Sequence, residues 1–513
     1  MLLWLVVIPL LTALCCLALP FSALRRASMV AGAAVHFVLV MRLWRHPAAS
    51  AFSGFLALDP LGQLMLTLIS LLLLATVIYF VGYHQRARLS KRVFQACMLV
   101  LLASLTLVCM SQHLGVLWVA LETASLASTP LIYFRLGPRA LEATWKFLLM
   151  NSVGIALALL GIFCIALATT PLAGAGITVP ELVRHAARLD PIWLRAGFLL
   201  ALVGFGTKMG LAPMHSWKPD AYSEAPPPVA AILSGGMTLG AFIGILRIYQ
   251  VTVAAGLAPF AGFWMIAFGL LSIAVAAVFI VGNNNYRRIL AYTSVEHMGI
   301  LVLGVGLSQE GAQSSMFHAM HNTLNKGILF FIAGFLWRIY GSNRISDVRG
   351  AVHRHPLAGI LLLAGLCATT GLPPFGMFFS EFGILIAAVQ QAHWWVAGLF
   401  VLTLAVVFVG VMTAMLPMAF GEPPPVTEPA TPLPGWGWRQ PVMLIPATAL
   451  AVVALVLGCY QPQPIRTALE EAAQTIYPAA VAPVGAASAA VADADSAAKA
   501  APTSAIASRE VKP

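Results

Sequence analysis

Apolar runs long enough to cross a membrane recur along the whole chain, and they restrict its fold more than any other feature. Of the 513 residues, 60% are hydrophobic and 9% are charged, which excludes a soluble domain of any size. At roughly 20 apolar residues per span, we expect about 14 spans and an all-α, polytopic membrane protein. The expected spans centre on residues 2–19, 28–43, 60–83, 94–111, 113–134, 145–169, 195–214, 226–248, 260–282, 288–307, 314–338, 356–391, 396–420 and 441–460.

One pair of spans is joined by an unusual stretch, GFGTKMGLAPMHSWKPDAYSEAPPPVAAIL, from Gly204 to Leu233. A charged side chain at a helix centre costs roughly 2.5–3.5 kcal/mol on insertion scales, so Lys208 is a candidate functional residue. Irregular backbone persists in hydrocarbon only where protein or a wet cavity surrounds it. A broken helix with an ionisable residue is typical of an ion pathway, and His215 is a secondary candidate there. The alternative is a proline-kinked helix whose lysine snorkels to the interface.

A shorter echo of this break occurs later in the chain. The motif GLPP at 371–374 resembles GLAP at 210–213, and Glu381 follows it. Each break then lies in a unit of five spans, and an odd number of spans makes consecutive units inverted, as in transporters with broken helices. We therefore predict the following divisions: N-terminal helices over 1–93, inverted repeats over 94–250 and 251–420, a last span with its flank over 421–477, and a disordered tail over 478–513.

The basic residues form short clusters between the apolar runs, as topology signals do. Most clusters fall on one side, which the positive-inside rule makes cytoplasmic, and both termini then face outward; Arg42 and Arg45 depart from this pattern. The net charge of +11 is thus not a sign of nucleic-acid binding, and the lipid bilayer is the expected environment. Between residues 171 and 191, PELVRHAARL predicts a short amphipathic helix on the membrane surface.

Two pairs of ionisable residues stand out in the first predicted repeat. Glu122 lies about mid-span, and a carboxylate there is either protonated or paired with a cation, for which Lys208 is the natural candidate. Glu142 and Lys146 are spaced i, i+4. They are secondary candidates, because this spacing is equally consistent with an ion pair at a helix end.

The span over 314–338 carries a polar stripe. His318, Asn322 and Lys326 are four residues apart, so they lie on one helix face, with His321 beside them. A histidine in such a stripe can titrate near neutral pH. For any single buried histidine, the alternative is a satisfied hydrogen bond between helices.

The sequence contains no legible metal or cofactor site. Its seven cysteines are scattered, without a C-x-x-C motif. Metal binding by His318 and His321 is disfavoured, because no carboxylate or thiolate lies nearby in the sequence. We expect no cofactor, no metal and no catalytic centre within the chain itself. Glu296 and His297 add a further polar pair in the preceding span.

Glu122, Lys208, Lys326 and Glu381 form alternating acid and base sites inside the predicted spans. Coupled titration of such groups lets a proton move stepwise, and it lets one site drive the next electrostatically.

At these residues the chain resembles a known family. The stretch GTKMGLAPMHSWKPDAYSEAP, the helix around Glu122, and the runs YRRILAYTSVEHMGIL and HAMHNTLNKGILFF are similar to the proton-conducting, antiporter-like subunits. That family comprises membrane subunits of respiratory complex I, Mrp sodium/proton antiporters and energy-conserving hydrogenases. LEATWKFLLMNSVGIALAL and SVEHMGIL resemble the hydrogenase-4 type in particular. The resemblance covers roughly residues 55 to 420.

The resemblance implies roles for individual residues. Glu122 and Lys208 match the glutamate–lysine pair of the family, Lys326 matches its central lysine, and Glu381 matches the terminal ionisable group. Leu239 stands where complex I subunits usually carry a bridging lysine. The family relay is therefore interrupted between its halves, unless His318 or ordered water takes over.

The function implied is proton translocation in a redox-driven complex of hydrogenase-4 or complex I type, in a bacterial-type inner membrane. The implied partners are other membrane subunits of such an assembly and its soluble redox arm. One alternative is an Mrp-like sodium/proton antiporter subunit. The other is a structural membrane anchor with a vestigial relay.

Overall fold

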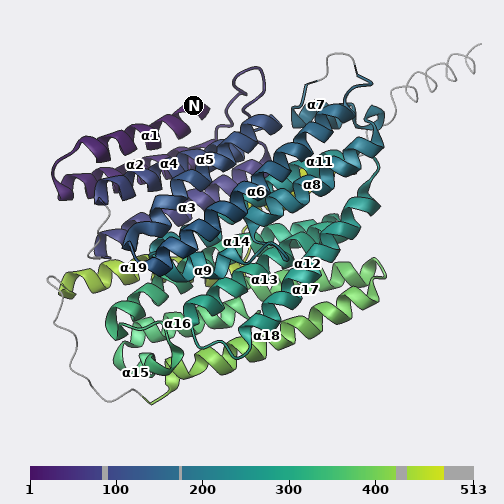
Figure 1. The fold of residues 1–513 in the computed structure, drawn as a ribbon. Helices are drawn as coiled ribbons and strands as arrows, with labels where there is room; N and C mark the ends of the chain where they lie inside the picture. Colours follow the sequence, from purple (N-terminus) through teal and green to yellow (C-terminus); the bar gives the residue numbers. More distant parts are fainter. Residues whose placement is uncertain (84–89, 173–175, 423–435, 479–513) are drawn as a thin grey trace, which may run out of the picture.

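The computed structural model describes residues 1–83, 90–172, 176–422 and 436–478, and it is built of helices (Figure 1). The helices in chain order are α1 (Leu2–Ala18), α2 (Ser22–Leu43), α3 (Pro60–Gly82), α4 (Lys91–Met110), α5 (Leu114–Ile132), α6 (Pro138–Ala168), α7 (Val179–Arg184), α8 (Pro191–Met209), α9 (Trp217–Glu224), α10 (Pro227–Ile232), the π-helical turn η3 (Leu233–Met237), α11 (Thr238–Ala254), α12 (Ala258–Ile280), α13 (Tyr286–Leu307), α14 (Gln309–Tyr340), α15 (Ala351–Arg354), α16 (Pro356–Thr369), α17 (Gly376–Gln390), α18 (Trp394–Phe420), α19 (Trp436–Cys459) and α20 (Gln463–Ile476). In this part of the chain, β-pairing is limited to isolated bridges.

The number of membrane spans agrees with the sequence. Eleven helices, counting α10 to α11 as one, are long and apolar enough to cross a membrane. The short helix α1, the polar-striped helix α14 and the broken pair α16–α17 complete the 14 expected spans in the described residues. The prediction of an all-α membrane protein is confirmed.

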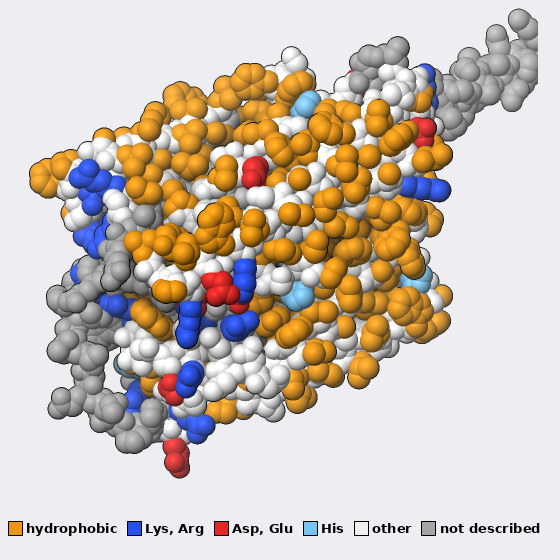
Figure 2. Space-filling view, viewed as in Figure 1, with side chains coloured by type: hydrophobic (Ala, Val, Ile, Leu, Met, Phe, Trp, Pro, Cys, Tyr) orange, Lys and Arg blue, Asp and Glu red, His pale blue; other side chains and the backbone are white. Residues whose placement is uncertain are grey.

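Burial separates the inner helices from the outer ones. Residues 227–249 are buried throughout, and α13 is almost wholly buried. The outer helices α1, α2 and α18 expose leucine, valine and tryptophan side chains, as lipid contact requires. In Figure 2, hydrophobic side chains cover most of the visible face, and most of the lysines and arginines on it lie in the left half. Inner helices can therefore hold polar groups away from lipid.

Both predicted breaks are present and end their first helix in the same way. Gly210 follows α8 in the left-handed conformation, and the amide of Leu211 donates to the carbonyl of Gly206, five residues earlier. After α16, Gly371 is left-handed too, and the amide of Leu372 donates to Cys367 at the same spacing. This is the pattern of a glycine-terminated helix. It ends α8 among buried residues, whereas Gly371 and Leu372 after α16 are partly exposed. The division into inverted units stays a prediction.

Some helices differ from the sequence expectations. The first break is irregular at 210–216 and again at 225–226, because α9 lies between these two segments. The expected amphipathic helix is α7 plus the 3₁₀ turn Ala186–Arg188, with Val179 and Leu182 buried. A further amphipathic helix, α20, packs against α3 and α14 after the last span. The predicted tail beyond 478, and Arg86 and Arg88 of the basic clusters, lie outside the described residues.

Candidate site: a buried row of ionisable side chains

The first predicted pair is in direct contact. Lys208, on the last turn of α8, is fully buried, and its Nζ donates to Glu122 Oε2 at 3.0 Å and to Ser125 Oγ. Glu122 and Ser125 are three residues apart on α5, so they lie on one helix face. The Glu122 side chain is 24% exposed, whereas that of Lys208 is inaccessible. An ion pair thus links a buried ammonium group to the outside of the chain.

A second lysine of the first break is also fully buried. Lys218 is the second residue of α9, and its Nζ donates to the backbone carbonyls of Met209 at 2.8 Å and Ser294 at 3.1 Å. Met209 adjoins Lys208, and Ser294 lies on α13. In the sequence, Lys218 lies within the stretch from Gly204 to Leu233, and it was not predicted as a functional residue. The burial of Lys218 could not be predicted from the sequence, because the residues around it predict irregular backbone.

The predicted stripe on α14 is buried as a whole, and it faces α13. Lys326 Nζ donates to Thr293 Oγ1 at 2.7 Å. Glu296 lies one turn further along α13 and interacts electrostatically with Lys326. Within the described part of the chain, Glu296 Oε2 and both side-chain polar atoms of Asn322 have no hydrogen-bond partner. The second half therefore holds its central lysine with a hydroxyl and a nearby carboxyl, without a close ion pair.

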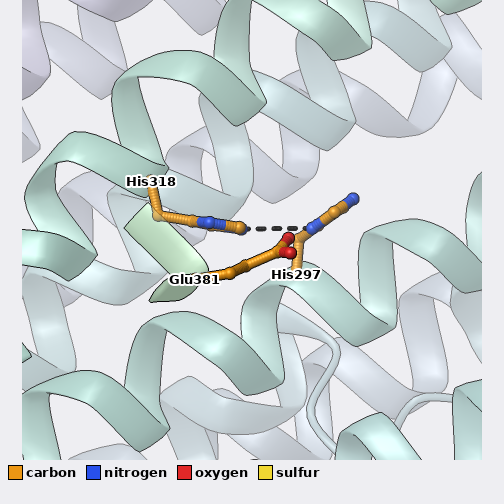
Figure 3. Close-up of side chains that lie close together, drawn as sticks. All are labelled: His297, His318 and Glu381. Atoms are coloured by element: carbon orange, nitrogen blue, oxygen red, sulfur yellow. Dashed lines mark hydrogen bonds between the residues drawn. The ribbon is translucent and has the colours of Figure 1, made fainter. Parts of the chain in front are cut away.

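His297, His318 and Glu381 come together from three different helices, α13, α14 and α17 (Figure 3). His297 Nδ1 and His318 Nε2 share a hydrogen bond of 3.1 Å. Their other ring nitrogens bond Thr369 Oγ1 at 3.2 Å and Ser380 Oγ at 2.8 Å, respectively. Figure 3 shows the Glu381 carboxylate directed toward the His297 ring. The second break thus delivers a carboxylate to a histidine pair.

This cluster has a donor set that a divalent cation accepts. One nitrogen of each histidine and a carboxylate oxygen of Glu381 lie within 4.8 Å of one another, and two imidazoles with a carboxylate are typical zinc ligands. Metal binding by His318 was disfavoured because no carboxylate lies nearby in the sequence, but the fold brings Glu381 of α17 close to it in space. His321 is outside the cluster; its ring lies against Gly376, and its Nε2 has no hydrogen-bond partner among the described residues.

The secondary candidates lie at the periphery. Lys146 pairs with Glu142 at 2.6 Å and with Asp220 of α9 at 2.9 Å. Arg288 of α13 also reaches Asp220, at 3.2 Å. His215 is half-buried beside aromatic rings. The expected Glu142–Lys146 ion pair is thus present, and it belongs to an exposed charged network that joins α6, α9 and α13.

The buried groups follow one another through the protein, and α13 connects them. On this helix Thr293, Ser294, Glu296 and His297 fall within about one turn and a half, and each is close to a group of another helix. We refer to the set as the ionisable row, and its members are Glu122, Lys208, Lys218, Glu296, Lys326, His297, His318 and Glu381. Such alternating acids and bases can transfer a proton from one end to the other.

Sequence reasoning found five members of the row and left three outside its candidate relay. Glu296 and His297 were recognised only as a polar pair, and Lys218 only as part of the break. The sequence did contain a signal for Glu296 and His297, because both lie in an apolar span that precedes the span with the polar stripe.

The family described as NADH:quinone oxidoreductase/Mrp antiporter, transmembrane, matches residues 111–407, which include every member of the ionisable row. The chain belongs to this family. The resemblance seen in the motifs is thereby confirmed, and the chain is an antiporter-like, multi-pass membrane subunit of a proton-translocating family.

Two relatives and one solved structure illustrate this membership. The hydrogenase-4 component F homolog of Methylacidiphilum infernorum is 34% identical over 345 residues, covering 65% of this chain and 71% of that protein. The NADH-quinone oxidoreductase subunit N of Deinococcus radiodurans is 32% identical over 420 residues, 80% of each protein. A chain of respiratory complex I from Thermus thermophilus is 25% identical with a TM-score of 0.74, over 89% of this chain and 96% of that chain. Each of these relatives is named as a component or subunit of a larger complex.

Proposed function

We propose that this chain translocates protons as a membrane subunit of a redox-driven complex of hydrogenase-4 or complex I type. The observation that carries the proposal is the ionisable row, which passes both broken helices and crosses from α5 to α17. The relatives named as hydrogenase-4 component F homolog and NADH-quinone oxidoreductase subunit N supply the type of complex.

The contacts indicate how the two ends of the row work. At one end, Glu122 holds the charged form of Lys208 by an ion pair. When Glu122 loses its charge or turns toward another partner, Lys208 is left charged in a low-dielectric site and releases its proton inward. At the other end, Glu381 can accept a proton that passes through the His297–His318 hydrogen bond, because each ring can donate at one nitrogen and accept at the other.

The partial exposure of Glu122 supports a membrane partner at the first end. A carboxylate that faces lipid at mid-span is costly, so a neighbouring subunit or a water-filled space covers it. We propose that this neighbour passes on the charge change produced by a soluble redox arm. We further propose a bacterial-type inner membrane with both termini outside. If cysteines introduced at Lys91 and Arg92 were labelled only from the outside, that result would contradict this orientation.

Sodium/proton antiport is the alternative of the same class. The row contains three fully buried lysines, at 208, 218 and 326, and a sodium ion that followed it would meet their positive charges. We therefore favour the proton. In a vestigial anchor, the desolvation of these three lysines would cost free energy and serve no function, so we disfavour that alternative.

The test is proton uptake by inverted vesicles that contain the intact complex. Lys208→Met and Lys326→Met should each lower uptake about tenfold or more, because a proton-transferring group contributes roughly 10²–10⁴. Lys91→Met, an exposed lysine outside the row, is the matched control. Normal uptake in both buried variants would favour the anchor, and uptake that requires sodium would favour the antiporter.

A further inference from the structure

Lys218 is buried, and no carboxylate in the described part of the chain forms an ion pair with it. Its side chain is fully inaccessible, and its two hydrogen-bond acceptors are backbone carbonyls. Among the described residues, no carboxylate lies within ion-pair distance of its Nζ. The ring of Tyr222 is 5.8 Å away, and the Tyr222 hydroxyl is buried with no hydrogen-bond partner in the described chain. Lys218 is thus a desolvated amine in a polar but uncharged pocket.

Packing alone does not account for a lysine at this position. A methionine or leucine would fill similar space without the cost of removing an ammonium group from water. A lysine in such surroundings changes its protonation state readily, which suits it to proton transfer. The residue therefore has the chemistry of a proton carrier.

The two contacts of Lys218 reach both halves of the row. Met209 O belongs to the residue next to Lys208, on the last turn of α8. Ser294 O belongs to the residue next to Thr293, whose hydroxyl accepts from Lys326 at 2.7 Å. A positive charge on Lys326 also disfavours a positive charge on Lys218, so the two groups interact electrostatically. Lys218 is therefore placed between the first-half lysine and the second-half lysine.

The turn η3, which precedes α11, also lies between the halves, but it offers no titratable side chain. Thr323 Oγ1 of α14 donates to Gly235 O at 3.5 Å, and Ser128 of α5 contacts Met237. Residues 227–246 contain no acidic, basic or histidine side chain. Leu239, the expected site of a bridging lysine by family resemblance, is fully buried.

His318 does not make this connection through its hydrogen bonds. Both of its ring nitrogens are used within the second half, on His297 and Ser380. The hypothesis that His318 bridges the halves therefore lacks a contact toward Lys208. Its contacts instead suit a step between Lys326 and Glu381.

We propose that Lys218 carries the proton between the two halves of the row. In the step, an N–H bond of the Lys208 ammonium breaks and an N–H bond forms on the neutral Lys218 amine. Lys218 then gives its proton to the Lys326 amine in the same way, so one positive charge moves along and no other reactant is consumed. This inference rests on the proposed function, and it names the group that replaces a lysine at position 239.

The experiment compares substitutions of Lys218 in inverted vesicles of the intact complex, with assembly and thermal unfolding measured for each variant. Lys218→Met should lower proton uptake about tenfold or more, as Lys208→Met does, while Lys91→Met stays normal. Lys218→Arg keeps a positive charge that does not dissociate, so it should not restore uptake. A purely structural role on the two carbonyls would instead be restored by arginine.

Lys218→His supplies a readout that a structural role would not change. Histidine is a proton carrier near its ordinary pKa of about 6.5, so uptake should be partly restored at about pH 6 and lost toward about pH 8. Restoration by Lys218→Arg, or a Lys218→Met variant that pumps normally while Lys208→Met does not, would overturn the role of Lys218 and leave the proposed function intact. Normal uptake in all three methionine variants, at positions 208, 218 and 326, would overturn the proposed function itself.

Discussion

The two halves of the molecule hold their ionisable groups differently. Up to residue 250, two buried cations are paired with carboxylates, in Lys208–Glu122 and Arg247–Asp59, whereas Lys218 bonds backbone carbonyls. From residue 251 to 420, the buried groups bond neutral partners: Lys326 bonds a threonine, and His297 and His318 bond each other and two hydroxyls. In the described chain, every carboxylate in an ion pair belongs to the first region, and these carboxylates are Asp59, Glu122, Glu142 and Asp220.

This difference separates fixed charges from exchangeable ones. Removing one partner of a buried ion pair leaves an uncompensated charge, at a cost of about 3–5 kcal/mol. A hydrogen bond between neutral groups can reverse its direction when a proton passes, and it leaves no such charge behind. We infer that the first region combines anchoring pairs with one pair that responds to a partner, and that the second region transfers protons at low electrostatic cost.

The largest expected effect concerns the anchoring pair. Arg247 is fully buried, and its Nη2 donates to Asp59 Oδ1 at 2.7 Å. Asp59→Asn preserves the helix cap on Gly62 but removes the charge, so it should lower the free energy of unfolding by about 3–5 kcal/mol. Thermal unfolding of the purified complex measures this. Glu142→Gln, in an exposed pair, is the control and should cost at most about 1 kcal/mol. Equal melting temperatures for the two variants would refute the distinction.

The second expected effect concerns the neutral histidine pair. His318→Phe keeps the ring volume but removes both nitrogens, and we expect proton uptake to fall about tenfold, as severely as in Lys326→Met. His36 is a matched control, because it is buried and bonds Ser70 and Thr106 through both ring nitrogens, outside the row. His36→Phe should lose comparable stability and keep normal uptake per assembled complex. If both histidine variants pump normally, the second region does not use this pair.

The smallest expected effect is a difference in accessibility. The side chain of Glu122 is 24% exposed, whereas Glu381 is a buried residue. With Cys15 and Cys459, the two exposed cysteines, replaced by serine, Glu122→Cys should react with a maleimide in the isolated chain and be protected several-fold in the intact complex. Glu381→Cys should react slowly in both. If Glu122→Cys reacted equally in the isolated chain and in the complex, the proposal that a partner subunit covers this surface would be wrong.

The sequence was sufficient for the membrane class, the number of spans and the two breaks. It also identified Glu122 and Lys208 as partners, because each is costly in an apolar span and their charges are opposite. It did not identify Lys218 as buried, since the prolines and glycines around it predict a loop and say nothing of what covers that loop. The sequence did not reveal the amphipathic helix α20 either, because this helix follows the last apolar run and is not itself a hydrophobic span.

What the sequence by itself determined is local: which segments are apolar enough to span, where glycine and proline end them, and which polar residues share a helix face. These depend on neighbours within a few turns. Which acid meets which base was decided only by the tertiary structure. The Lys208–Glu122 contact spans 86 positions and the His318–Ser380 contact spans 62. Such contacts depend on the rotation and depth at which whole helices pack, and many side chains along each helix contribute to that packing.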